Sequence, residues 1–143
     1  MVYRLYRLLR KDEDWSFGLS AKNPIAEKSV FDHVIDGSRT GWQSQYIATC
    51  GSTETVKMFE SNSHSPGHIV RILVDDSQVT IIDLRTSVQR SSHYQPDNLA
   101  NDLIEKFNNY ANKYETVLLV GNIPIVYVRL SVSASLTAYA IPP

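Results

Sequence analysis

Four polar side chains lie in segments that are otherwise suited to a protein core: Arg7, His33, Thr49 and Glu115. Glu115 stands at the head of an apolar run, residues 117–120, directly before a glycine. A carboxylate held there could stabilise a developing positive charge. The permanently charged fork of Arg7 suits a phosphate group or the fixing of nearby backbone. Each residue alone also has an ordinary interpretation, because strand-end glutamates are usually solvated and lone helical histidines usually pack.

Several kinds of catalytic machinery are missing from the sequence. No glycine-rich phosphate loop of the P-loop or dinucleotide-binding type is present. The chain has one cysteine, Cys50, and its four histidines lack the close spacing of a zinc site. We therefore expect neither a disulfide framework nor a catalytic metal.

The elements that would position these side chains can be predicted from hydropathy patterns and capping residues. Ser29 and Gly37 mark the beginning and end of a short helix over residues 29–36, and Ser52 can cap a second helix. A third helix begins at Asp97 and carries one apolar stripe: Leu99, Leu103, Phe107, Tyr110 and Tyr114. Strands are predicted over residues 2–9, 44–50, 68–75, 79–84, 115–120 and 123–130.

Two connections have the composition of hairpin turns, residues 75–78 and residues 121–122. The order is one of strands interrupted by short helices, with many short connections. This order favours an α+β fold over a doubly wound parallel sheet.

The overall composition narrows the possible classes of protein. The chain has 143 residues, 43% of them hydrophobic, which suits one domain spanning residues 1–143. Lys and Arg number 14 and Asp and Glu 15, so the large basic excess of a typical nucleic-acid-binding domain is absent, although a local groove could still hold a strand. No apolar run is long enough to span a membrane, so we expect no membrane partner and a cytoplasmic or nuclear location.

In order along the chain, short motifs make this sequence resemble the catalytic domains of cholera-toxin-like ADP-ribosyltransferases. Tyr6-Arg7 is followed by acidic residues 12–14 and by Gly18-Leu19. "FDHVIDGSRTGWQS" then matches the family's aromatic-Asp-His helix and polar loop, and "YIATCGSTETV" its Ser-Thr-Ser strand. "ETVLLVGNIP" follows the form of the strand that begins with the catalytic glutamate. The resemblance covers roughly residues 3–125 and implies an ADP-ribosyltransferase-like α+β fold, a split two-sheet core with short helices.

The resemblance also implies NAD as the substrate and assigns roles within a shared cleft. Glu115 would stabilise the oxocarbenium-like charge on the ribose. Arg7 would contact an NAD phosphate and Thr49 would brace the strand beside the nicotinamide. His33 would make a supporting contact. The remaining candidates for contact with NAD are Ala48, Tyr46 and Arg4. Arg4 is the rival of Arg7, because the side chains of a regular strand alternate between its two faces and only one of these two arginines can enter the cleft.

The sequence departs from the family pattern at two places. Ala48-Thr49-Cys50 stands where the family has Ser-Thr-Ser, so one hydroxyl is missing. Lys113 stands two residues before Glu115, where the family commonly has an acceptor-recognising Glu or Gln. An ammonium group only donates hydrogen bonds and repels a cationic acceptor. Lys113 therefore either attracts an anionic acceptor, such as a nucleotide or nucleic acid, or simply ends a helix with a favourable charge.

The main hypothesis from the sequence is a mono-ADP-ribosyltransferase acting on an acceptor that the sequence does not identify. Two alternatives remain: a protein of the same fold that binds NAD or a related nucleotide without turnover, and an NAD glycohydrolase in which water is the acceptor. All three require a cleft, and the enzyme hypotheses place Glu115 and the guanidinium of Arg7 in one cavity.

Overall fold

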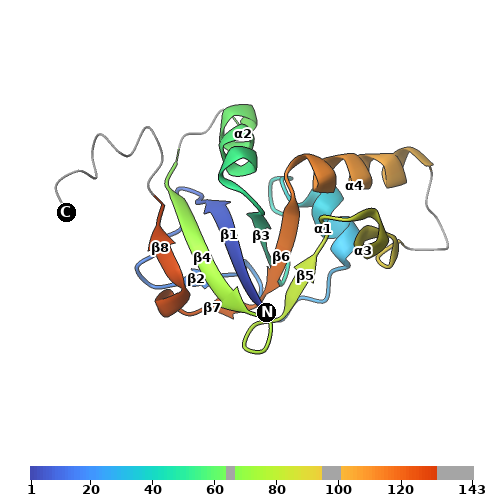
Figure 1. Cartoon of the computed structure of the whole chain (residues 1–143). Coiled ribbons are helices and arrows are strands. Elements are labelled where there is room, and N and C mark those ends of the chain that lie inside the picture. Colours follow the sequence, from blue (N-terminus) through green and yellow to red (C-terminus); the bar gives the residue numbers. More distant parts are fainter. Residues whose placement is uncertain (64–66, 95–100, 132–143) are drawn as a thin grey trace.

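The computed structural model describes residues 1–63, 67–94 and 101–131, and its centre is a six-stranded antiparallel sheet (Figure 1). The strand order is β5-β6-β3-β1-β4-β8, so neighbours in the sheet are distant in sequence. The strands are β1 (Val2–Leu8), β3 (Tyr46–Cys50), β4 (Ile69–Asp75), β5 (Ile81–Asp83), β6 (Thr116–Val120) and β8 (Val128–Leu130).

The sheet divides into two halves between β1 and β3. These two strands share a single register pair, Tyr6 with Cys50. By contrast, β1 pairs with β4 over its whole length, and β3 pairs with β6 over its whole length. The half formed by β5, β6 and β3 is therefore joined only narrowly to the half formed by β1, β4 and β8, and the strands separate beyond the shared pair.

A second, two-stranded sheet formed by β2 (Leu19–Ser20) and β7 (Asn122–Ile123) helps to enclose the main core. Gly18 has a φ of +83°, and a side chain there would collide with the carbonyl oxygen of Ile123. Glycine is thus required for β2 to approach β7. The buried residues of this core are Leu5, Leu9, Leu19, Ala21, Ile47, Val70, Ile72, Val74, Val79, Val117, Leu119, Ile123 and Val128.

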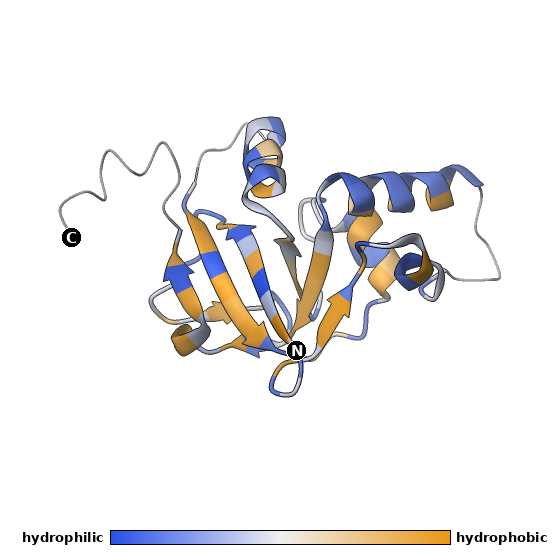
Figure 2. Ribbon diagram, viewed as in Figure 1, coloured by the Kyte–Doolittle hydropathy of each residue, from blue (hydrophilic) through white to orange (hydrophobic). Residues whose placement is uncertain are grey.

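Of the four α-helices within the described residues, three lie beside the β5–β6 half of the sheet, and the fourth lies across one end (Figure 1). They are α1 (Val30–Asp36), α3 (Ser87–Ser91) and α4 (Asn101–Lys113), with α2 (Thr53–Ser63) at the end. Phe31 of α1 stacks on Phe107 of α4 with ring centroids 4.8 Å apart. Figure 2 shows α4 as largely hydrophilic, and its buried residues are Phe107 and Ala111. Within the described ranges, no helix is long and apolar enough to cross a membrane.

The predicted helix starts are confirmed where the structure describes them. The Ser29 hydroxyl caps α1 and Gly37 ends it, and Ser52 precedes α2. Asp97 and Leu99 lie outside the described residues. Phe107 and Tyr114 of the predicted stripe are buried, whereas Leu103 is 37% exposed.

Both predicted hairpins are wrong. β4 and β5 do follow one another along the chain, yet three strands lie between them in the sheet. β6 likewise pairs with β3 and β5, not with the chain that follows it. The predicted strand over residues 123–130 is interrupted at Pro124, where β7, a 3-10 turn and β8 succeed one another. The residues of a turn indicate only that the chain changes direction there. Which strand the next one pairs with depends on buried contacts between distant residues.

Candidate functional site

Arg7 occupies the point at which the two halves of the sheet separate. Its side chain is only 10% exposed. Nη1 donates a 2.7 Å hydrogen bond to the carbonyl oxygen of Ala48 on β3. Since β1 and β3 pair only at Tyr6 and Cys50, this carbonyl lies where a regular strand pair has ended. The guanidinium therefore takes the place of a backbone donor and holds the two strands at their split.

The rest of the Arg7 guanidinium is paired with Glu13. Nε and Nη2 donate to the two carboxylate oxygens of Glu13 at 3.1 and 2.9 Å, a bidentate geometry. The Glu13 side chain is 7% exposed and also accepts a hydrogen bond from the backbone of Arg10. Each of the three nitrogen atoms of Arg7 thus already donates one hydrogen bond within the protein.

A cavity of about 260 Å³ opens beside Arg7, and we name it the Arg7 cavity. Four predicted positions line it: Arg7, His33, Tyr46 and Ala48. They come from β1, α1 and β3, so the fold brings together residues spread over forty positions of the chain. The other lining residues are Leu8, Arg10, Lys22, Val34, Gly37, Ser38, Trp42, Ser44, Phe59, Tyr110, Thr116 and Leu118.

His33 is held in one neutral tautomer at the wall of this cavity. Its Nδ1 lies 3.3 Å from Nε1 of Trp42 and 2.7 Å from the hydroxyl of Ser44. An indole N–H can only donate, so Nδ1 is the acceptor and Nε2 carries the proton. Burial, reinforced by the charges of Arg7 and Lys22, lowers the pKa of His33 to about 4. In the described parts of the chain, no three His, Cys, Asp or Glu residues are grouped to hold a metal ion.

A second cavity of about 620 Å³ adjoins the first, and we name it the outer cavity. Arg10, Lys22 and Trp42 line both cavities, so the two are neighbours that share part of their walls. Arg10 pairs with Asp12 and Glu13. Lys22 takes part in no ion pair within the described residues. The junction of the cavities therefore carries a cation available to an anionic group.

Glu115 lies next to this cleft but does not line either cavity that contains Arg7. Its neighbours Tyr114 and Thr116 do line a small cavity of about 60 Å³ together with Arg7. The expectation that the Glu115 side chain shares a cavity with Arg7 is therefore not met. The reason is local: the Glu115 backbone has a φ of +47°, and the hydroxyl of Ser52 donates a hydrogen bond to its carboxylate.

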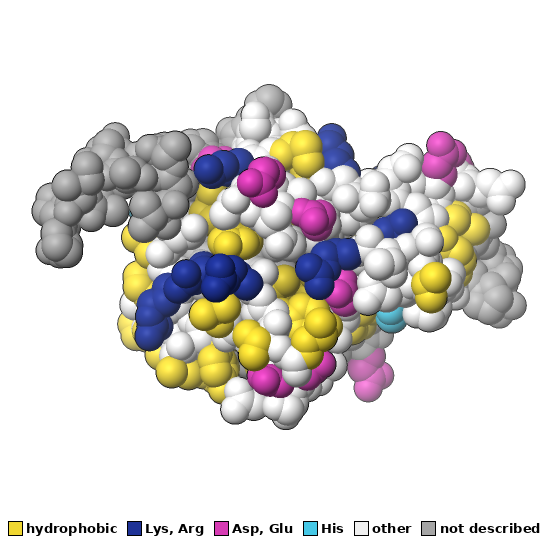
Figure 3. Space-filling view, viewed as in Figure 1, with side chains coloured by type: hydrophobic (Ala, Val, Ile, Leu, Met, Phe, Trp, Pro, Cys, Tyr) yellow, Lys and Arg dark blue, Asp and Glu magenta, His cyan; other side chains and the backbone are white. Residues whose placement is uncertain are grey.

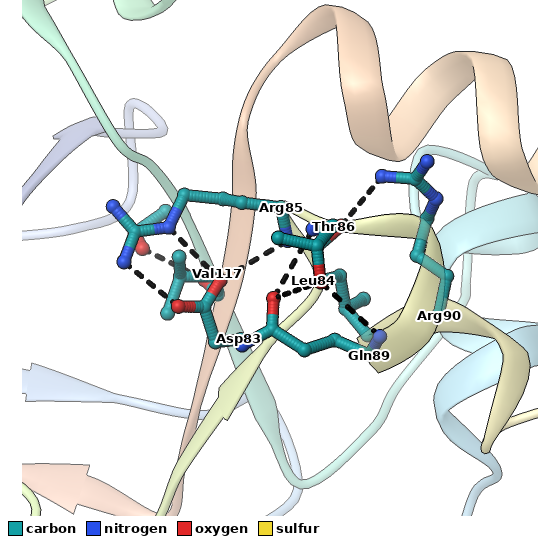
Figure 4. Close-up of polar contacts among 8 residues, drawn as sticks. Asp83, Leu84, Arg85, Thr86, Gln89, Arg90 and Val117 are labelled. Carbon is teal, nitrogen blue, oxygen red and sulfur yellow. Dashed lines mark hydrogen bonds and ion pairs between the residues drawn. The ribbon is translucent and has the colours of Figure 1, made fainter.

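The surroundings of Glu115 are crowded on one side by Arg85. A Cβ at Gly51 would lie 3.1 Å from both Cδ of Arg85 and Cβ of Glu115, so a side chain there would press on both residues. Arg85 itself donates to Asp83 at 2.7 and 2.9 Å (Figure 4). That hydrogen-bonded ion pair raises the pKa of Arg85, and the charge of Glu115 contributes. A non-glycine residue at a left-handed φ costs free energy and is frequent at functional sites.

Thr49 braces the sheet and does not contact Glu115. Its side chain is buried, and its hydroxyl donates a 2.7 Å hydrogen bond to the carbonyl oxygen of Val117 on β6. This fixes β3 against the strand that follows Glu115. The bracing role is therefore consistent with the geometry, whereas direct positioning of the carboxylate falls to Ser52.

Three further candidates occupy distinct positions. Tyr46 lines the Arg7 cavity, meets the His33 ring edge-on and donates to the carbonyl oxygen of Lys28. Arg4 is exposed and lines none of the cavities that contain Arg7, so it is not the rival cleft arginine. Lys113 ends α4, with its ammonium 5.4 Å from the Tyr114 ring centre. It lines neither the Arg7 cavity nor the small cavity of about 60 Å³.

Sequence reasoning missed three residues of this site: Glu13, Lys22 and Ser52. Glu13 belongs to an acidic run that, in sequence, looks like a solvated turn, and only the burial of Arg7 reveals its partner. Ser52 was assigned only as a helix cap, and it does accept a hydrogen bond from the Thr55 backbone. The missing hydroxyl at Ala48 was the available signal, because it predicts that another donor must hold Glu115.

Comparison with known proteins supports the fold. No family model matches the chain, and no curated protein matches it. A solved structure named EcPltA superimposes with a TM-score of 0.61 at 15% identity, covering 87% of this chain and 71% of that one. Identity at this level establishes a common fold and no more. The protein therefore has an α+β architecture similar to that of EcPltA and consistent with the split, ADP-ribosyltransferase-like core expected from the sequence.

Proposed function

We propose that this protein is an NAD-dependent mono-ADP-ribosyltransferase. The observation that carries the proposal is the convergence of Arg7, His33, Tyr46 and Ala48 on one cavity at the split of the sheet. These positions were selected from three separate motifs of the sequence. A fold without a site there has no need to bring a buried arginine, a neutral histidine and an aromatic ring together around a hollow.

In this proposal the NAD phosphates bind at the junction of the two cavities. All three nitrogen atoms of Arg7 donate to Glu13 or Ala48, so its part is to hold β1 and β3 at the correct separation. Lys22 supplies positive charge for the pyrophosphate, since Arg10 is already paired with Asp12 and Glu13. Trp42 lines both cavities and offers a ring for stacking.

Glu115 acts from the edge of the cleft. As the bond between nicotinamide and ribose breaks, its electron pair leaves with nicotinamide and positive charge develops on the sugar. A fixed carboxylate stabilises that charge, and the Ser52 hydrogen bond restricts where this carboxylate lies. A nucleophile of the acceptor then forms the new bond to the ribose carbon and loses its proton. Lys113 favours an anionic acceptor over an arginine side chain.

The proposal is tested by incubating the protein with labelled NAD and candidate protein and nucleic-acid acceptors, followed by mass spectrometry of the products. We expect free nicotinamide and an acceptor that has gained ADP-ribose. Glu115→Ala should lower nicotinamide release at least about 100-fold, the loss typical of removing one transition-state-stabilising group. Equal release by the wild type and this variant would rule the enzyme out. Free ADP-ribose without a modified acceptor would identify an NAD glycohydrolase.

The role of Lys22 has a separate test. Lys22→Gln should raise the KM for NAD about tenfold, since one charge-assisted contact is lost. Release of nicotinamide from nicotinamide riboside, which has no phosphate, should be unchanged. Lys11→Gln is the matched control because Lys11 is exposed and lines neither cavity. An equal effect on both substrates would mean that Lys22 does not bind phosphate.

The second candidate function is nucleotide binding without turnover. It is favoured by the position of Glu115 outside the Arg7 cavities and by the Glu13 carboxylate that already occupies Arg7. Calorimetry separates the candidates: this one requires heat of binding with NAD that persists in Glu115→Ala, together with no nicotinamide in the products. Detected turnover would exclude it.

A further inference from the structure

Three arginines form a row across the half of the sheet made of β1, β4 and β8, where α2 packs against β1. Arg71 on β4 is directly opposite Arg129 on β8 and, on its other side, directly opposite Tyr6 on β1. Arg4 lies two residues from Tyr6 and therefore on the same face of β1. Figure 3 shows the result as a band of Lys and Arg side chains over β8, β4 and β1. We name Arg4, Arg71 and Arg129 the arginine row.

This arrangement is unfavourable for the protein alone. Directly opposite side chains on antiparallel strands have Cβ atoms about 5 Å apart, and like charges there destabilise the pair. Among the described residues, none of the three arginines forms an ion pair with a carboxylate. The acids at the end of β4, Asp75 and Asp76, pair with the N-terminal amino group instead. No carboxylate thus compensates the repulsion between Arg71 and Arg129, although Nη1 of Arg129 donates to the carbonyl oxygens of Ile125 and Val128.

Protection of a sheet edge does not explain the row. Charged residues on edge strands prevent edge-to-edge association, and this accounts for Arg129 on β8. Arg71 and Arg4 belong to β4 and β1, which are interior strands paired on both sides. Their charges lie on the face of the sheet, where they have no bearing on strand addition. A ligand that supplies negative charge across three strands accounts for all of them.

We infer that the arginine row binds the phosphates of a single nucleic-acid strand. Guanidinium groups bind phosphate with paired hydrogen bonds, and all three members are arginine rather than lysine. The row crosses the strands, so a peptide could not extend the sheet along it. Tyr6 lies on the same face and is half-buried against Val56 and Ile69, so only its exposed edge adds an aromatic surface to the basic residues, a combination typical of surfaces that bind single strands.

The test is fluorescence anisotropy of a labelled single-stranded oligonucleotide, measured without NAD on the full chain at several salt concentrations. Binding is read directly, so the result does not depend on the proposed enzyme activity. The row variant is Arg4→Gln, Arg71→Gln and Arg129→Gln together. The control variant removes three exposed charges elsewhere, at Arg39, Lys57 and Lys106, and each variant is checked by circular dichroism and thermal unfolding.

We expect the row variant to bind at least tenfold more weakly and its log–log salt slope to be smaller by about 2, since each phosphate contact on a single strand contributes about 0.7. The control variant should bind almost as the wild type does. Absence of binding by the wild type, or equal losses in both variants, would overturn the inference. So would tighter binding of a polyglutamate peptide than of the oligonucleotide, because the partner would then be an acidic protein.

If the row variant fails to fold, the single variant Arg71→Gln replaces it. Arg71 stands between Tyr6 and Arg129, so its loss divides the row, while it relieves the repulsion of the opposite pair. We expect this variant to be at least as stable as the wild type and to bind the oligonucleotide more weakly. Unchanged binding by a folded Arg71→Gln protein would also overturn the inference.

Discussion

The two halves of the sheet each contribute one charged side chain near the split, and the two are held in opposite ways. Arg7, from the β1 half, is 10% exposed and donates to three oxygen atoms of the protein. Glu115, from the β6 half, is partly exposed and accepts one side-chain hydrogen bond within the described residues, from Ser52. All three nitrogen atoms of Arg7 thus donate hydrogen bonds within the protein, whereas the Glu115 carboxylate can accept further hydrogen bonds.

This difference separates two roles that the family resemblance treats together. A residue whose polar atoms are all paired within the protein sets the shape of a cleft. A residue held by one hydroxyl on a strained backbone is positioned for a ligand and remains free to contact it. We therefore expect changes at Arg7 and its partners to act mainly on stability, and changes at Glu115 and its partner to act mainly on turnover.

The largest effect on stability is expected from Arg7→Ala. It leaves the Glu13 carboxylate 7% exposed and without its main partner, which costs about 3 kcal/mol or more. It also leaves the Ala48 carbonyl without a donor. The free energy of unfolding, measured with urea, should fall by that amount.

The double variant Arg7→Ala with Glu13→Gln is the control for this prediction. Removing the stranded charge should restore part of the lost stability, since the penalty comes mostly from a buried, unpaired carboxylate. If the stability losses of Arg7→Ala and Glu13→Gln, measured singly, add up to the loss of the double variant, the two side chains are not coupled. The ion pair then does not hold β1 and β3 together at their split.

The second prediction concerns the dependence of stability on pH. The pKa of His33 is about 4 in the folded protein, against 6.5 for an unperturbed histidine. Below pH 6.5 the unfolded chain therefore binds a proton that the folded protein does not, and stability falls as the pH decreases towards 4. The loss reaches at most about 3 kcal/mol. His33→Gln should flatten this slope, and His68→Gln, at an exposed position, is the matched control.

The His33 result also bears on the comparison, because Arg7 contributes to the lowered pKa. In Arg7→Ala the His33 pKa, followed by NMR, should rise towards its ordinary value. A pKa that stays near 4 would assign the shift to burial and Lys22, and would show that Arg7 does not influence His33.

The sequence predicted the separate elements well and their pairing poorly. Capping by Ser29 and Gly37 depends on residues that are close together in the chain, so local patterns suffice. Both hairpins were wrong because the position of β6 between β5 and β3 depends on buried contacts between distant residues. Arg7 was found through a motif, but its partner Glu13 required the fold, since nothing local distinguishes a buried acid from a solvated one.

A smaller effect on stability is expected from Ser52→Ala. Its hydroxyl accepts from the Thr55 backbone at the start of α2, and loss of such a cap costs about 1 kcal/mol. Because the same hydroxyl holds Glu115, nicotinamide release should also fall about tenfold. Thr55→Ala disturbs the same cap and removes the hydroxyl 3.0 Å from Ser52 Oγ, but it keeps the Ser52 hydroxyl that donates to Glu115, so it should lose stability and keep more turnover than Ser52→Ala. If Ser52→Ala and Thr55→Ala release nicotinamide at the same rate, Ser52 does not position Glu115.

The smallest effect on stability is expected from Glu115→Gln. The substitution keeps the size of the side chain and the same left-handed backbone, and an amide oxygen still accepts from Ser52. Unfolding free energy should therefore change by no more than about 0.5 kcal/mol, as for most partly exposed positions. Nicotinamide release should nevertheless be lost, because a neutral amide cannot stabilise positive charge on the ribose. Urea unfolding and NAD turnover are measured on one preparation. A large loss of stability would instead mean that Glu115, like Arg7, mainly stabilises the fold.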